Sequence, residues 1–256
     1  MLLRPGFIAG LFLLTAASAQ AQQGYEFEVY RPEIGAVASS EIELSTNYAA
    51  TGLPDTDEGL FATHHAFRSS LEVNRTLSNW LQATAYLTVN KRPGHALAYV
   101  GNRFKITTVA PSTWSFPVEL GFVNELSYAR PGFAEDPWTY EITPIVGKTF
   151  GPVSLVFNPA FERGFSGSGV HHVEVEPRGA IAYGLGDETS VALEYYAGLG
   201  GLGEHYSVAE QRHQIFAKFV GEVSRHLEFN IGVGRGLTMS SDRWVITSAL
   251  EYSLGR

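Results

Sequence analysis

The 256-residue sequence contains no cysteine, so no disulfide stabilises the folded chain and no thiol chemistry is available. Basic residues are scarce: 18 Lys and Arg stand against 26 Asp and Glu, which gives a formal net charge of −8. A chain with this charge does not bind nucleic acid non-specifically, and we expect no nucleic-acid partner. Beyond the N-terminus there is no run of about 18 or more consecutive apolar residues, which excludes a helical membrane protein.

Residues 1–21 have the pattern of a secretory signal peptide. Arg4 is followed by an apolar stretch of roughly ten residues and then by the small residues Ala17, Ser18, Ala19 and Ala21, which offer two cleavage points. The apolar stretch is too short for a transmembrane helix, so a retained membrane anchor is the weaker alternative. We therefore predict that the chain crosses the inner membrane and loses its signal peptide.

The rest of the chain reads as β-structure. Aromatic residues make up 12% of the sequence and glycine occurs 27 times, a composition typical of strands joined by tight turns. In the stretch 118–128, the even-numbered positions include the apolar residues Leu120 and Phe122, and the odd-numbered positions include Glu119 and Glu125. This alternation is expected in a β-strand, where successive side chains point to opposite faces. Twelve such segments are predicted, at residues 41–48, 62–74, 81–89, 98–108, 118–128, 138–146, 153–162, 173–183, 190–199, 212–220, 227–233 and 244–254.

The links between these segments alternate in length. Even-numbered segments are followed by short links such as 76–79 and 147–152, whereas odd-numbered segments are followed by longer links rich in Gly, Pro and Asp, such as 50–61 and 200–210. Outer-membrane barrels have short periplasmic turns and longer outside loops, and an even strand count returns both termini to the periplasm. We predict an all-β, transmembrane antiparallel β-barrel of about 12 strands; a soluble sandwich or jelly roll is the alternative.

The signal peptide, the alternating segments and the apolar-aromatic closing strand 244–254 resemble a Gram-negative outer-membrane β-barrel protein. The stretches 138–159 and 192–200 are similar to porin-like barrel proteins of Gram-negative bacteria. The resemblance covers the whole mature chain. It implies a location in the outer membrane, with outer-membrane lipid and the barrel-assembly machinery as partners. Such proteins usually end on an aromatic residue that this machinery reads, whereas this chain ends Leu254-Gly255-Arg256.

These observations divide the chain into a signal peptide (1–21), a periplasmic N-terminal segment (22–36) and the barrel (37–256). Within the N-terminal segment, we expect the stretch 25–34 to plug or cap the barrel's inner end.

A barrel's polar face lines its lumen, and here that face is charged. The predicted lumen-lining residues are Glu43, Arg68, Glu72, Arg103, Lys105, Glu119, Glu125, Glu141, Glu162, Glu174, Glu176, Arg178, Glu194, Lys218, Glu228 and Glu251. As a pore wall they favour passage or binding of a small cationic or polyhydroxyl solute over anions. As a salt-bridged network they fit a closed, structural or surface-interaction barrel equally well. The sequence leaves both interpretations open.

An outer-leaflet lipid-modifying enzyme is a third hypothesis. Its candidate groups are His64, His65, His95, His171, His172, His205 and His213, with Ser69, Ser70, Ser166 and Ser168 in the same neighbourhood. No G-x-S-x-G or other nucleophile signature occurs, and adjacent histidines on a strand point to opposite faces, so each pair offers at most one ligand to a metal. We expect no catalytic residues, no metal and no cofactor.

Overall fold

A computed structural model describes residues 27–55, 59–166, 172–186 and 188–254; the predicted signal peptide lies outside these ranges. The chain forms a single antiparallel sheet of fourteen strands, two of them only two residues long. The long strands are β1 (Ser40–Thr51), β2 (Phe67–Ser78), β3 (Leu81–Lys91), β4 (Ala98–Val109), β5 (Glu119–Ala129), β6 (Trp138–Phe150), β7 (Val153–Gly164), β8 (Val173–Gly184), β9 (Thr189–Gly198), β12 (Arg212–Ser224), β13 (Leu227–Gly236) and β14 (Trp244–Leu254). The short strands are β10 (Gly200–Gly201) and β11 (Glu204–His205).

The sheet closes on itself. The first strand, β1, pairs with the last, β14, from Ser40↔Leu254 to Thr51↔Trp244, and every other long strand pairs with its neighbours in the sequence. The predicted antiparallel barrel of about twelve strands is therefore confirmed.

The described ranges contain no helix that is long and apolar enough to cross a membrane, and their one helical element is the 3₁₀ turn η1 (Ser112–Trp114).

Apolar side chains cover the outside of the barrel and polar side chains fill it. On the outer face, Ile231 of β13 is 51% exposed and Leu193 of β9 is 55% exposed. On the inner face, polar residues such as Thr84, Asn158 and Lys105 are at most 4% exposed. A soluble sandwich has the opposite arrangement, because its apolar residues meet a dry core. The barrel's outer surface therefore suits a lipid environment.

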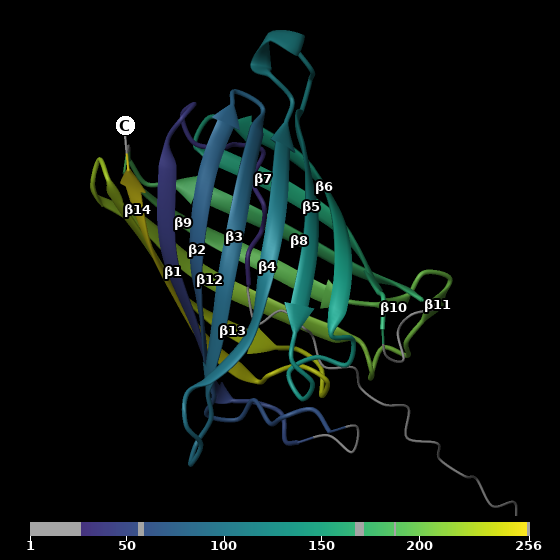
Figure 1. Ribbon diagram of the computed structural model, residues 1–256. Coiled ribbons are helices and arrows are strands. Elements are labelled where there is room, and N and C mark those ends of the chain that lie inside the picture. Colours follow the sequence, from purple (N-terminus) through teal and green to yellow (C-terminus); the bar gives the residue numbers. More distant parts are fainter. Residues whose placement is uncertain (1–26, 56–58, 167–171, 187, 255–256) are drawn as a thin grey trace, which may run out of the picture.

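The two ends of the barrel differ in their connections (Figure 1). At the end where β1 begins and β14 ends, here called the turn end, most neighbouring strands are joined by short links, and Gly151 (φ +56°) supplies the left-handed conformation that the β6–β7 turn requires. At the opposite end, the loop end, the links are longer, as in 52–66 and 199–211. The predicted alternation of link lengths is thus present.

Two local details differ from the predicted segments. The strand expected at 62–74 begins at Phe67, because residues 59–66 belong to the long β1–β2 link. The alternation along 98–108 places Val100 with Phe104 and Ile106 on the apolar face and so predicts that it lies outside, but in β4 it is 3% exposed and packs with Ala129 and Phe133. The cause is a β-bulge: the register of β4 shifts by one residue at this point, which turns Val100 inward.

A glycine on β13 makes room for an aromatic side chain inside the barrel. A Cβ atom at Gly234 would lie 2.2 Å from the ring of Phe216, which is fully buried. We expect G234A to destabilise the barrel by about 1–3 kcal/mol, because the ring must move within a packed interior. The measurement is urea unfolding in lipid vesicles. G184A is the matched control, since its new Cβ has no neighbour closer than 3.7 Å. Equal stability of the two variants would contradict this packing.

Candidate functional site in the barrel lumen

Four glutamates stand side by side on the inner face of neighbouring strands. The strand register pairs Glu125 of β5 with Glu141 of β6, Glu141 with Glu162 of β7, and Glu162 with Glu174 of β8. We call these residues the β5–β8 acid row. Like charges directly opposite one another in a sheet are destabilising, so this arrangement requires compensating cations or a polar, hydrated lumen.

A second acid row lies across the strands that close the barrel. Here Glu228 of β13 pairs with Glu251 of β14, Glu251 with Glu43 of β1, and Glu43 with Glu72 of β2. We call this the β13–β2 acid row. The row runs from Glu228, which is exposed at the turn-end rim, to Glu72, which is 7% exposed inside the barrel. Eight of the acids on the inner face are therefore grouped into two separate rows.

Basic side chains compensate part of this charge. Arg103 lies 3.4 Å from Glu125 and Arg178 is paired with Glu141. The remaining lumen pairs are Lys105–Glu72 (3.7 Å), Lys218–Glu194 (2.7 Å) and Arg212–Glu176 (2.5 Å). Arg212 was not among the predicted residues, although its parity with Gln214 and Lys218 places it on the inner face of β12. The alternation of side chains along this strand was the sequence signal that could have identified Arg212.

Within the described ranges, Glu43 and Glu162 form no ion pair with a basic side chain. Glu162 accepts a hydrogen bond from Thr139 (3.2 Å). At the loop end, Tyr206 donates a hydrogen bond to Glu174 (3.4 Å). Burial and the charge of Glu174 raise the pKa of Tyr206, so its hydroxyl keeps the proton that it donates.

Two further predicted residues lie at the ends of the lumen. Arg68 is 7% exposed near the loop end, with its guanidinium 5.7 Å from the centre of the Phe133 ring. Glu119 is exposed at the turn-end rim of β5. The structure therefore brings Arg68 to the loop-end cavity described below and leaves Glu119 at the opposite mouth.

The chain that precedes β1 runs inside the barrel, where polar side chains hold its backbone (Figure 1). The amide N–H of Tyr30 donates to Asn158 Oδ1 (2.7 Å), and Asn158 Nδ2 donates back to the Tyr30 carbonyl (3.0 Å). Lys218 Nζ donates to the carbonyl of Phe27 (2.6 Å). Glu28 lies 3.6 Å from Lys105, which connects the segment to the lumen charges.

Apolar contacts hold the same segment. The ring of Phe27 packs against those of Phe216 (centroids 4.3 Å apart) and Tyr196 (5.4 Å). Phe27, Val29 and Tyr30 are each at most 8% exposed and join one apolar cluster with inward side chains of the strands. Full burial of a side chain of this size contributes roughly 1.5–3 kcal/mol, so these contacts hold the segment firmly.

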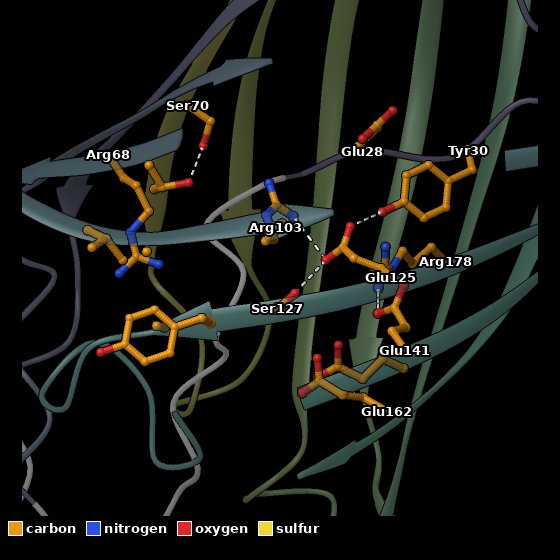
Figure 2. A pocket seen from close by; sticks show the side chains of 16 residues that line it. Glu28, Tyr30, Arg68, Ser70, Arg103, Glu125, Ser127, Glu141, Glu162 and Arg178 are labelled. Carbon is orange, nitrogen blue, oxygen red and sulfur yellow. Dashed lines mark hydrogen bonds and ion pairs between the residues drawn. The ribbon is translucent and has the colours of Figure 1, made fainter. Parts of the chain in front are cut away.

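A cavity opens beside this segment in the loop-end half of the barrel (Figure 2). Its charged lining comprises Arg68, Arg103, Arg178, Glu125, Glu141, Glu162 and Glu176, and the N-terminal segment contributes Glu28 and Tyr30. Glu125 lies at the centre of a hydrogen-bonded group, since it accepts from Ser127 (2.9 Å), Arg103 (3.4 Å) and the Tyr30 hydroxyl (3.4 Å). The cavity therefore offers a solute both carboxylate acceptors and guanidinium donors.

Four of the candidate histidines and serines form hydrogen bonds to hydroxyl groups. The hydroxyl of Ser69 bonds that of Thr46, and Ser70 bonds Thr88, in each case at 2.9 Å. His65 and His213 bond tyrosine hydroxyls, those of Tyr48 and Tyr195. Ser168 and His171 lie outside the described residues. In the ranges that the structure covers, no group of three or more His, Cys, Asp or Glu side chains could hold a metal ion.

No protein-family model matches the sequence, and no curated protein matches it. Among solved structures, the chain is similar to the COG4313 outer membrane channel from Pseudomonas putida F1, with a TM-score of 0.61 and 10% identity over 90% of this chain and 100% of that one. The fold is that of an outer-membrane β-barrel. The barrel is also similar to a KdgM porin in complex with disordered oligogalacturonate, with a TM-score of 0.51 and 10% identity over 85% of this chain and 99% of that one. At this identity the likeness establishes the fold alone.

Proposed function

We propose that the protein is an outer-membrane channel that binds and passes a small polar solute and favours cations or polyhydroxyl compounds over anions. The observation that carries this proposal is the cavity in the loop-end half of the lumen, lined by three glutamates of the β5–β8 acid row, by Glu176 and by three arginines. A narrow lumen with low-dielectric walls concentrates the field of its charged groups on whatever enters it. The two solved channels of similar fold support the same role.

The sign of the lumen charge supports the preference for cations. On the inner face of the described strands and in the N-terminal segment, carboxylates outnumber bases. The bases include Arg31, Arg68, Arg103, Lys105, Arg178, Arg212 and Lys218; the carboxylates include Glu28, Glu33, Glu41, Glu43, Glu72, Glu119, Glu125, Glu141, Glu162, Glu174, Glu176, Glu194, Glu228 and Glu251.

Neutralising Glu43 and Glu162, which form no ion pair with a described basic side chain, tests this proposal. We expect E43Q/E162Q to lower the cation-to-anion permeability ratio by about twofold or more, because it removes negative charge without leaving any lysine or arginine unpaired. The measurement is the reversal potential in a KCl gradient across a planar bilayer. E188Q is the matched control, because Glu188 is an exposed carboxylate in the β8–β9 turn.

The proposal fails if barrels whose folding is verified by a heat-modifiable gel shift give no conductance steps. The preference for cations over anions is contradicted if E43Q/E162Q and E188Q have the same reversal potential.

The second candidate is a non-conducting barrel with a structural or surface-interaction role. It is favoured by the ion pairs and by the N-terminal segment, which together occupy much of the lumen. An outer-leaflet enzyme gains no support from Ser69 and Ser70, whose hydroxyls bond the hydroxyls of Thr46 and Thr88.

A further inference from the structure

The N-terminal segment is bound to the barrel without being part of its sheet. Within the described ranges, residues 27–35 make no hydrogen bond to another main-chain group, and no strand is formed before Ser40. Their backbone is held by side chains alone, those of Asn158 and Lys218. Side-chain contacts of this kind break without disturbing a β-ladder.

The barrel is complete without the segment. Each of the twelve long strands pairs with two neighbours, and the β1–β14 ladder closes the ring. Withdrawal of residues 27–32 would therefore leave all strand pairing intact. Withdrawal would expose polar groups that water can solvate, those of Lys105, Asn158 and Lys218, together with the apolar side chains that the segment covers, such as Phe216.

The route out of the lumen is set by the chain itself. After Pro32 the segment reaches the turn-end mouth, where Glu33, Ala36 and Val37 are exposed, and Ser40 then begins β1. Residues 33–37 are thus a partly exposed tether, and Ala38 and Ser39 anchor it at the turn end by main-chain hydrogen bonds to Thr76 of β2 (3.0 and 3.2 Å). Withdrawal towards the turn end follows the path of the chain between Pro32 and this anchor.

We propose that residues 27–32 are a displaceable plug that closes the channel and must withdraw through the turn end before solute passes. This inference rests on the proposed channel function. The plug occupies a lumen site shaped for a short extended peptide: Asn158 brackets the backbone of Tyr30, an aromatic pocket takes the side chain of Phe27, and Gly147 leaves space for Pro32. A peptide bound by both its main chain and its side chains is recognised specifically.

Because the native sequence contains no cysteine, one introduced pair of cysteines can hold the plug in place by a disulfide, and a reductant can release it. A Cβ atom at Gly147 would lie 2.8 Å from Pro32 Cγ, so P32C/G147C places two thiols where a disulfide can form. In planar bilayers we expect the oxidised variant to lack full-size openings and dithiothreitol to restore them. Deletion of residues 27–35 is expected to raise conductance several-fold. The single variants P32C and G147C control for the substitutions themselves.

A second measurement reports plug position without relying on conductance. A thiol introduced by V29C is buried when the plug is seated, because Val29 is 8% exposed. Adding N158A removes the bracket on Tyr30, so we expect a bulky maleimide to label the thiol several-fold faster in V29C/N158A than in V29C. N230A is the matched control, because Asn230 lies on the inner face of β13 and, unlike Asn158, does not hydrogen-bond the backbone of Tyr30.

The outcomes separate the two proposals. Full-size openings of the oxidised P32C/G147C variant, or unchanged conductance after deletion, would overturn the plug. If folded barrels conduct in no variant, the channel function fails. Labelling then decides whether the segment moves: equal rates in V29C and V29C/N158A would show a fixed structural segment. A faster rate in V29C/N158A would support a displaceable segment in a barrel that is not a channel.

Discussion

Replacing Lys105 by methionine is expected to destabilise the folded barrel by about 3–5 kcal/mol, because removing one partner of a buried ion pair leaves the other charge uncompensated. The Lys105 ammonium group lies 3.7 Å from Glu72 and 3.6 Å from Glu28, and the residue is only 4% exposed. It also lies 4.9 Å from the centre of the Tyr86 ring. Methionine preserves length and volume, so the loss is one of charge. Urea unfolding in lipid vesicles measures it.

Two further variants test that interpretation. The combination K105M/E72Q/E28Q is expected to recover much of the stability, because it removes the carboxylates that K105M leaves unpaired. K91M is the control for loss of a lysine at an exposed position near the loop end and should change stability by no more than about 0.5 kcal/mol. If K105M and K91M unfold at the same urea concentration, water in the lumen screens these charges and the ion pair contributes little.

Replacing Ile231 by arginine is expected to destabilise the barrel by about 2–4 kcal/mol in a bilayer, the cost of a cation on the lipid face near the membrane midplane. Ile231 lies in the middle of β13 and is 51% exposed on the outer face. The preceding residue, Asn230, points into the lumen of the same strand. N230R is therefore a matched control with the same new charge, one position away and on the opposite face.

We expect N230R to cost far less than I231R, because its guanidinium enters a polar lumen that already has an excess of carboxylates. Unfolding of both variants in vesicles, with folding verified by the gel shift, gives the comparison. Equal costs for the two variants would mean that the outer face is not in contact with lipid. The comparison therefore tests the placement of the barrel in a membrane as well as the orientation of β13.

The side-chain alternation predicted much of the candidate site, because parity along a strand fixes which residues share a face. It placed Glu125, Glu141 and Glu162 on one face of their strands, and the structure places them on the inner face. Parity failed at Val100, where a β-bulge inserts one residue and reverses the alternation.

Other parts of the site had no local signal. The aligned acid rows depend on the register between strands, and a shift of two residues along any strand would keep parity while separating the acids. The hydrogen bonds between Asn158 and the backbone of Tyr30 had no sequence signal either, because they join residues 128 positions apart in the sequence. Such contacts depend on the closed barrel and cannot be read from either segment alone.

The sequence by itself determined the class of protein: a cysteine-free chain with alternating apolar and polar residues and alternating link lengths forms a barrel with an apolar outer face. These are local properties, since each strand and each turn carries its own share of the pattern. Only the tertiary structure decided that the glutamates form two aligned rows and that residues 27–32 lie among them. The physical reason is closure: strand register and the space left inside the barrel are fixed only when β1 meets β14.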